Sequence, residues 1–164
     1  MKQIVIFSSK TGFTEFYAKL IAKALETEAV SLSDIKAKKL GDYDSVVFGG
    51  WIMASNITGL MKIRKYVTGS LYLFGVGATI PSEENTALII KQNKIEGLPF
   101  FYMPGGLNKD KLSFFKRKML DMVASAEAKN PSQTQQHSLR TSFDLTDEKY
   151  IEPLVKAVRE AVNA

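Results

Sequence analysis

The first apolar run of the chain, Gln3-Ile-Val-Ile-Phe7, constrains the fold more than any other feature. A strand with apolar residues at successive positions is buried on both faces, and such strands belong to parallel sheets covered by helices. A loop rich in hydroxyl groups follows at 8–14. Apolar residues then recur with helical spacing at Tyr17, Leu20, Ile21, Ala24 and Leu25. We therefore expect a buried strand, a loop and an amphipathic helix that packs on a parallel sheet.

Further strands and helices alternate along the chain, as a parallel α/β sheet requires. The expected strands are at 29–32, 45–49, 71–76 and 99–103. The expected helices are at about 58–67, at about 82–93 and in a last segment that ends near Asn163, with Pro153 in or near its first turn. These elements predict an α/β fold.

At 164 residues, the chain has the length of one domain, and we expect a single domain over 1–164. The stretch 104–145 is much longer than an ordinary connection between a strand and a helix, so we interpret it as an insertion. Within it, 112–128 has the pattern of a basic amphipathic helix, 130–137 is polar and loop-like, and 138–145 could return as a short strand.

Composition excludes several kinds of site. The chain has no cysteine, which excludes disulfides, thiolate metal sites and cysteine nucleophiles, and it has one histidine, His137. The first apolar run is too short for the core of a signal peptide. We therefore expect a cytoplasmic protein without a metal site.

The loop at 8–14 has the chemistry of an anion site. It carries hydroxyl groups at Ser8, Ser9, Thr11 and Thr14, a glycine at position 12, and then the start of a helix. Ligands of parallel α/β sheets bind at the carboxyl ends of strands, and free N–H groups at a helix start favour a phosphate. Ordinary capping of the helix by a serine or threonine is the simpler alternative, but four hydroxyl groups exceed what capping needs.

Other phosphate-binding classes do not fit. The chain lacks the Gly-x-x-x-x-Gly-Lys-Ser/Thr motif of nucleoside triphosphatases. It also lacks the Gly-x-Gly-x-x-Gly motif of dinucleotide-binding folds after a strand. A phospho-receiver domain needs acidic residues after the first strand and an aspartate after the third. This chain has Ser8-Ser9 and Gly49-Gly50 at those places.

The segment Ser9-Lys10-Thr11-Gly12-Phe13-Thr14 resembles the phosphate-binding signature of the flavodoxin family. The resemblance implies a flavodoxin-like three-layer sandwich with a five-stranded parallel sheet in the order 2-1-3-4-5. It also implies FMN as the cofactor. Ser9, Thr11, Gly12 and Thr14 would hold its phosphate, with main-chain N–H groups from Lys10 and Phe13.

In that family the flavin ring lies between the loops after strands three and four. By resemblance, these loops are 50–56 and 77–80 here, and the cofactor-binding candidates are Gly50, Trp51, Ile52, Met53, Gly77, Ala78 and Thr79. Trp51 fits a ring contact or a core aromatic residue about equally well. Asn56 and Thr79 are either polar partners of the ring or loop-forming residues.

The chain differs from electron-shuttling flavodoxins in two respects. It has no aromatic residue at 77–80 to stack on the outer face of the flavin, and it is basic, with a formal net charge of +5. The insertion and its return into the last helix make it similar to a subgroup that includes the menaquinone-dependent protoporphyrinogen oxidases of bacteria.

The basic segment 111–123 leaves several partners open. Its apolar side either covers the sheet edge and the flavin pocket, or contacts an anionic membrane surface, where a quinone would be within reach. An acidic protein partner is a further option. Nucleic acid is not expected, because no basic run alternates with aromatic residues.

Three functions remain open at this point. The first is an FMN protein that carries electrons between redox partners, without an acid–base pair of its own. The second is a quinone-dependent FMN oxidoreductase of the protoporphyrinogen oxidase type, with an NAD(P)H-dependent quinone reductase as a variant. The third is a binding module that has lost its cofactor, which the intact Thr11, Gly12 and Thr14 argue against.

Overall fold

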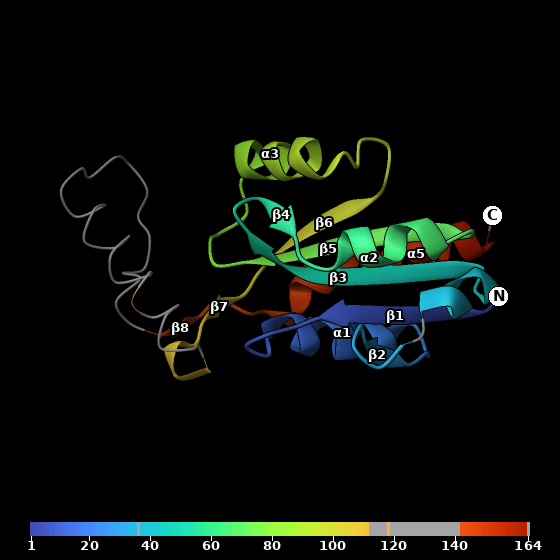
Figure 1. Cartoon of the computed structure of the whole chain (residues 1–164), viewed down its shortest axis with the longest axis horizontal. Coiled ribbons are helices and arrows are strands. Elements are labelled where there is room, and N and C mark those ends of the chain that lie inside the picture. Colours follow the sequence, from blue (N-terminus) through green and yellow to red (C-terminus); the bar gives the residue numbers. More distant parts are fainter. Residues whose placement is uncertain (36, 112–117, 119–141, 164) are drawn as a thin grey trace.

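The computed structural model describes residues 1–35, 37–111, 118 and 142–163. Its main sheet follows the order β2-β1-β3-β5-β6, and every pairing along this path is parallel. The strands are β1 (Gln3–Ser8), β2 (Ala29–Ser31), β3 (Ser45–Met53), β5 (Ser70–Gly77) and β6 (Phe100–Pro104). The predicted α/β fold and its 2-1-3-4-5 strand order are therefore confirmed (Figure 1).

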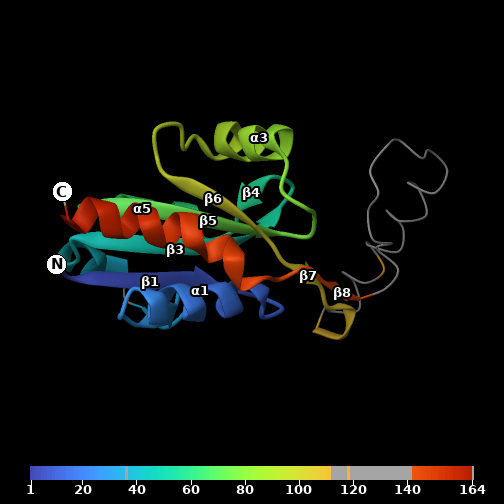
Figure 2. The ribbon, with the colours of Figure 1, turned by 180° about the vertical axis from the view of Figure 1, so that it is seen from behind.

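Helices cover both faces of this sheet. Helices α1 (Phe13–Ala24) and α5 (Glu152–Asn163) pack on one face, and α2 (Leu60–Ile63) and α3 (Glu83–Asn93) pack on the other. Figure 2 shows the face that carries α1 and α5. The predicted three layers are thus present, with the sheet in the middle.

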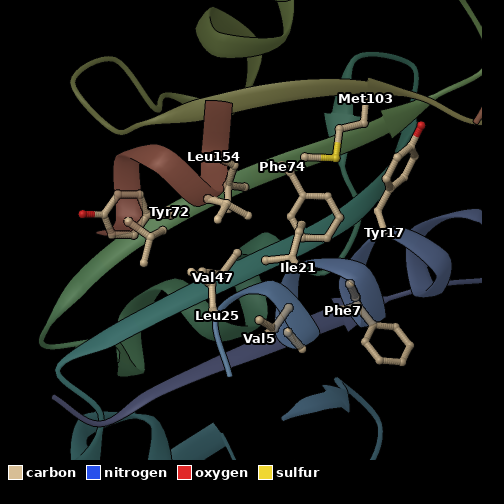
Figure 3. Close-up of a cluster of buried hydrophobic side chains, with 14 of the residues drawn as sticks. Val5, Phe7, Tyr17, Ile21, Leu25, Val47, Tyr72, Phe74, Met103 and Leu154 are labelled. Atoms are coloured by element: carbon tan, nitrogen blue, oxygen red, sulfur yellow. The ribbon is translucent and has the colours of Figure 1, made fainter. Parts of the chain in front are cut away.

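The apolar run of β1 contributes to two separate cores. Val5 and Phe7 join the cluster under α1 and α5, whereas Ile4 and Ile6 join the cluster under α2 and α3. Figure 3 shows the first of these clusters, in which Phe74 lies between residues of β3, α1 and α5. Because successive side chains of a strand point to opposite faces, an uninterrupted apolar run is what this central position requires.

The helices match the expected segments with one correction. Helix α3 begins after Ser82, whose Oγ accepts a hydrogen bond from Asn85 N (3.2 Å), and Pro153 is the second residue of α5. The helix expected at 58–67 is instead one α-helical turn, α2, followed by the 3₁₀ turn η2 (Arg64–Tyr66). The longer helix does not form because Val67 already has the extended backbone that leads into β5.

Short elements complete the described chain. Strand β4 (Asn56–Ile57) pairs antiparallel with the end of β3, and β7 (Gly106–Leu107) pairs antiparallel with β8 (Phe143–Asp144). Three further 3₁₀ turns are η1 (Ala37–Asp42), η3 (Lys109–Lys111) and η4 (Glu148–Ile151). In Figure 1, β7 and β8 lie at the edge opposite the two chain ends. Strand β8 confirms a short strand within 138–145.

The amphipathic helix expected at 112–128 and the polar loop expected at 130–137 lie outside the described residues, apart from Lys118. Their structure and the membrane contact of 111–123 stay predictions. The division into one domain with an insertion at 104–145 also stays a prediction. None of the helices in the described ranges is long and apolar enough to cross a bilayer.

Candidate functional site

The loop between β1 and α1 leaves the start of α1 without a side-chain cap. Gly12 is the N-cap residue, has a left-handed backbone with φ of 102°, and makes no side-chain capping bond to the N–H groups of the helix. Its own N–H donates to Ser9 Oγ (3.2 Å), and Phe16 N donates to Gly12 O (2.9 Å). The N–H groups of the first helical residues, Phe13 to Glu15, have no acceptor within a helix. This end of α1 can therefore accept an anion.

Hydroxyl groups accompany these N–H groups. Thr14 is the second residue of α1 and is only 1% exposed, and Thr11 is half-buried. Within the described part of the chain, neither hydroxyl makes a hydrogen bond. Ser9, Thr11, Gly12 and Thr14 thus lie in the loop at the carboxyl end of β1 and in the first turn of α1.

Phe13 has a side-chain role that the sequence did not indicate. A Cβ atom on Gly106 would lie 2.7 Å from the Phe13 ring, and one on Gly105 would lie 3.2 Å from Phe13 Cβ. The absence of side chains at both glycines lets the chain after β6 pass directly over the first residue of α1. The glycine pair at 105–106 was the only signal in the sequence for this contact.

The loop expected at 50–56 is mostly strand, which is a correction. Gly50, Trp51, Ile52 and Met53 all belong to β3, because this strand continues into an antiparallel hairpin with β4. Ile52 pairs with Ile57, and Met53 pairs with Asn56. Only Ala54 and Ser55 form the turn, and both have positive φ, 46° and 62°. This turn contains no glycine and no asparagine–glycine pair. The usual sequence signal of a hairpin is therefore missing here.

Alternation along β3 divides these residues between two faces. Ile52 packs at the edge of the cluster under α2 and α3, where a Cβ on Gly75 would lie 2.7 Å from Ile52 Cδ1. Trp51 and Met53 lie on the opposite face, which is the α1 side. Lys10 Nζ lies 5.8 Å from the centroid of the Trp51 ring, so the phosphate-binding candidates and this hairpin are neighbours. Ile52 is not on that shared side.

Asn93, the last residue of α3, holds the hairpin in place. Its Nδ2 donates to Ser55 O (2.7 Å), and its Oδ1 accepts from Ile57 N (2.9 Å). Asn56, for which the sequence left open a polar partner of the ring or a loop-forming residue, donates to Ala54 O within its own turn (3.0 Å). No sequence signal links Asn93 to a turn 38 residues earlier.

The loop after β5 is held by Tyr102 of β6. The Tyr102 hydroxyl donates to Thr79 O (3.0 Å), accepts from Thr79 N (3.3 Å) and lies 2.8 Å from Thr79 Oγ1. Burial raises the pKa of Tyr102 above its usual range, so the proton that makes these contacts is retained at neutral pH. Gly77 ends β5 beneath the Tyr102 ring, and Ala78 is exposed.

Tyr17 of α1 connects the end of β6 to the segment before α5. Its buried hydroxyl donates to Pro104 O (2.6 Å) and accepts from Asp147 N (3.2 Å). Figure 3 shows this ring beside Met103. Burial raises the pKa of Tyr17 to about 12.

Replacing Tyr17 with phenylalanine tests this connection. We expect Tyr17→Phe to lower the free energy of unfolding at pH 7 by about 2 kcal/mol, because two backbone groups lose their partner. The folded-state pKa lies above the unfolded value, so the stability linked to this proton is complete below pH 10 and is lost as pH rises to about 12. The free energy of unfolding, measured with urea, should therefore fall more steeply between pH 10 and 12 in the wild type than in the variant. Parallel profiles would contradict this account.

Within the described ranges, no group of three or more histidine, aspartate or glutamate side chains could hold a metal ion. The hydrogen-bonding groups at the carboxyl end of β1 are N–H and hydroxyl groups, and lysine side chains lie nearby. That set of groups suits a phosphate.

Comparison with known proteins gives a family. A family model described as the flavodoxin domain matches residues 4–135. The matched range contains the loop between β1 and α1, the β3–β4 hairpin and the loop after β5. A search of curated proteins found no match.

Comparison with solved structures also found similar chains. A flavodoxin from the domain Archaea is 16% identical, with 77% of this chain and 99% of that chain covered and a TM-score of 0.47. Flavodoxin 1 from Bacillus cereus is 17% identical, with 68% and 89% covered and a TM-score of 0.49. Rubredoxin oxygen:oxidoreductase from Desulfovibrio gigas is 14% identical, with 78% of this chain and 35% of that chain covered and a TM-score of 0.46.

Proposed function

This chain belongs to the flavodoxin domain family, and we propose that it binds FMN at the carboxyl ends of β1, β3 and β5 and carries electrons between redox partners. The observation that supports this most is the start of α1, where Gly12 has φ of 102° and the hydroxyls of Thr11 and Thr14 make no hydrogen bond to any described residue. A phosphate needs several hydrogen-bond donors that no protein group already occupies. This loop supplies them.

The residues present fit the phosphate of FMN. Gly12 has open space, because among the described residues, its chain neighbours aside, the single heavy atom within 4 Å of an added Cβ is the Nζ of Lys111. Ser9 accepts from Gly12 N and thereby fixes the loop before the helix begins. We assign the phosphate to Ser9, Thr11, Gly12 and Thr14, with main-chain N–H groups of Lys10 and Phe13.

We place the ring system on the α1 side of the β3–β4 hairpin. Trp51 is half-buried and Met53 is 56% exposed there, so both have surface for a flat apolar ring. Ala78 and Thr79 would face the ring from the end of the neighbouring strand, where Tyr102 holds Thr79 by hydrogen bonds. Contacts from Gly50, Ile52 and Gly77 stay predictions. When bound, FMN supplies reversible transfer of one or two electrons.

Flavin content tests the proposal directly. Purified protein should be yellow, and protein stripped of flavin should gain stability when FMN is added. At a hundredfold excess over the dissociation constant, binding contributes about 2.7 kcal/mol, which corresponds to a rise in Tm of about 5–10 °C for a chain of this size. A colourless protein whose Tm does not respond to FMN would contradict the proposal.

A second candidate function is supported by the exposed apolar residues near the proposed ring. Met53 is 56% exposed and Ile80 is 66% exposed, and the loop 77–80 has no aromatic residue to cover the outer face of a flavin. An open apolar face suits a quinone or another planar substrate, as in the protoporphyrinogen oxidase subgroup. Oxidation of protoporphyrinogen by flavin-loaded protein and a menaquinone analogue should then exceed the rate of autoxidation. Equal rates would remove this candidate.

The cytoplasmic location stays a prediction.

A further inference from the structure

The chain after β6 returns to the start of α1. Gly105 N donates to Gly77 O (2.7 Å), and Leu145 N donates to Gly105 O (2.7 Å). Strand β7 then packs over the Phe13 ring through Gly106. Because hydrogen bonds and ring packing both hold it, this stretch of the insertion has a defined position beside the proposed phosphate loop.

The turn η3 follows β7 and places one lysine at that loop. Lys111 N donates to Asn108 O (3.3 Å), which closes the turn. A Cβ atom on Gly12 would lie 3.6 Å from Lys111 Nζ. In the described part of the chain, Lys111 Nζ has no carboxylate within ion-pair distance. Its positive charge is therefore presented to the loop.

The charged residues of the loop and of the first turn of α1, Lys10 and Glu15, have different neighbours. The ammonium group of Lys10 lies over the Trp51 ring, and Glu15 forms an ion pair with Lys19 (2.6 Å). Lys111 is thus the described side chain that brings an uncompensated charge to Gly12. A dianionic phosphate at this place would gain both the N–H groups of α1 and an ammonium partner.

We propose that Lys111 is a specificity-determining residue, which pairs with the phosphate of the flavin and makes the chain select FMN over riboflavin by charge. This inference rests on the proposed function. The hydroxyl and N–H groups of the loop would bind any phosphate, whereas Lys111 adds a dependence on its double negative charge. The interaction is partly exposed, so salt should weaken it.

The test compares Lys111→Gln with Lys2→Gln as a matched control. Lys2 precedes β1 at the amino end of this strand, away from the loop at its carboxyl end. Its removal changes the net charge equally. Titrations of flavin fluorescence at low and high salt give the affinities for FMN and riboflavin. We expect Lys111→Gln to weaken FMN binding about 10-fold at low salt, to reduce its salt dependence, and to leave riboflavin affinity unchanged. Lys111→Arg should stay within about threefold of the wild type, as a charged donor is kept.

A second readout reports on the phosphate itself. In ³¹P spectra of the bound flavin, the titration midpoint of the phosphate should move to higher pH in Lys111→Gln, because a neighbouring cation favours the dianion. Equal FMN affinities and equal midpoints in Lys111→Gln and Lys2→Gln would overturn this inference alone. Wild-type protein that binds no FMN would overturn it together with the proposed function.

Discussion

Gly12→Asp is expected to weaken FMN binding by more than about 100-fold while the protein stays folded. The added side chain has room, since in the part of the chain that the structure describes a Cβ meets nothing closer than Lys111 Nζ at 3.6 Å. Its carboxylate would pair with that ammonium and occupy the place of the phosphate, so the ligand loses charged hydrogen bonds that contribute about 1.5–3 kcal/mol each. The φ of 102° costs a residue other than glycine roughly 1–2 kcal/mol of stability. Fluorescence titration with FMN measures the effect.

Two variants separate charge from backbone strain in this experiment. Gly12→Ala adds the strain without the charge and should lose far less affinity. Gly97→Asp is the matched control, because Gly97 also has a positive φ, 86°, and lies between α3 and β6, with no atom of the described ranges within 4 Å of an added Cβ. It should bind FMN as the wild type does. If Gly12→Asp also binds FMN with wild-type affinity, the phosphate site lies elsewhere.

Asn93→Leu is expected to have the second largest effect, because it releases the β3–β4 hairpin. The substitution leaves Ser55 O and Ile57 N without their partner, which costs about 2–4 kcal/mol. For a chain of this size the corresponding fall in Tm is about 5–12 °C. The positive φ of Ala54 and Ser55 makes the turn strained, so it depends on this bond. We expect binding of FMN and of riboflavin to weaken together, by about tenfold.

Neighbouring substitutions control for general effects on α3. Gln92→Leu makes a similar change at an exposed position one residue earlier and should leave Tm and flavin affinity near the wild type. Asn93→Asp keeps an acceptor for Ile57 N but loses the donor to Ser55 O, so it should be intermediate. If Asn93→Leu lowers Tm but leaves both affinities unchanged, the hairpin does not contribute to ring binding.

The two main predictions differ in which ligand, FMN or riboflavin, should bind more weakly. Gly12→Asp should change FMN binding and leave riboflavin binding nearly unchanged, because riboflavin has no phosphate. Asn93→Leu should change both, because both ligands have the same ring system. The pattern thus distinguishes a defect at the phosphate end from one at the ring end of the proposed site.

Local patterns were sufficient for the parallel sheet and for the place of the loop 8–14 between a strand and a helix. The apolar run of β1 predicted a strand buried on both faces, and it lies between β2 and β3 with one core on each side. The residues Ser9 to Thr14 are consecutive, so their position between a strand and a helix followed from the order of the chain. Pro153 likewise marked the first turn of α5 through short-range backbone chemistry.

The ring side of the site was predicted less well, because it depends on contacts between distant residues. The sequence indicated a loop from Gly50 onward, whereas the strand continues to Met53 and folds back as β4. Asn93 stabilises this hairpin across 36 residues from Ile57, and Tyr102 holds Thr79 across 23. Periodicity reports which face of an element is buried, but it contains no information on which distant side chain completes a turn.

By itself, then, the sequence determined the parallel α/β sheet, the order of its elements along the chain and the hydroxyl-rich loop between β1 and α1. Each of these follows from neighbours along the chain. Only the tertiary structure decided that Trp51 and Met53 lie on the α1 side of a hairpin, and that Lys111 lies beside Gly12, 99 positions earlier. Such contacts arise when a packed sheet brings the ends of separate strands to one edge, which is a property of the whole fold.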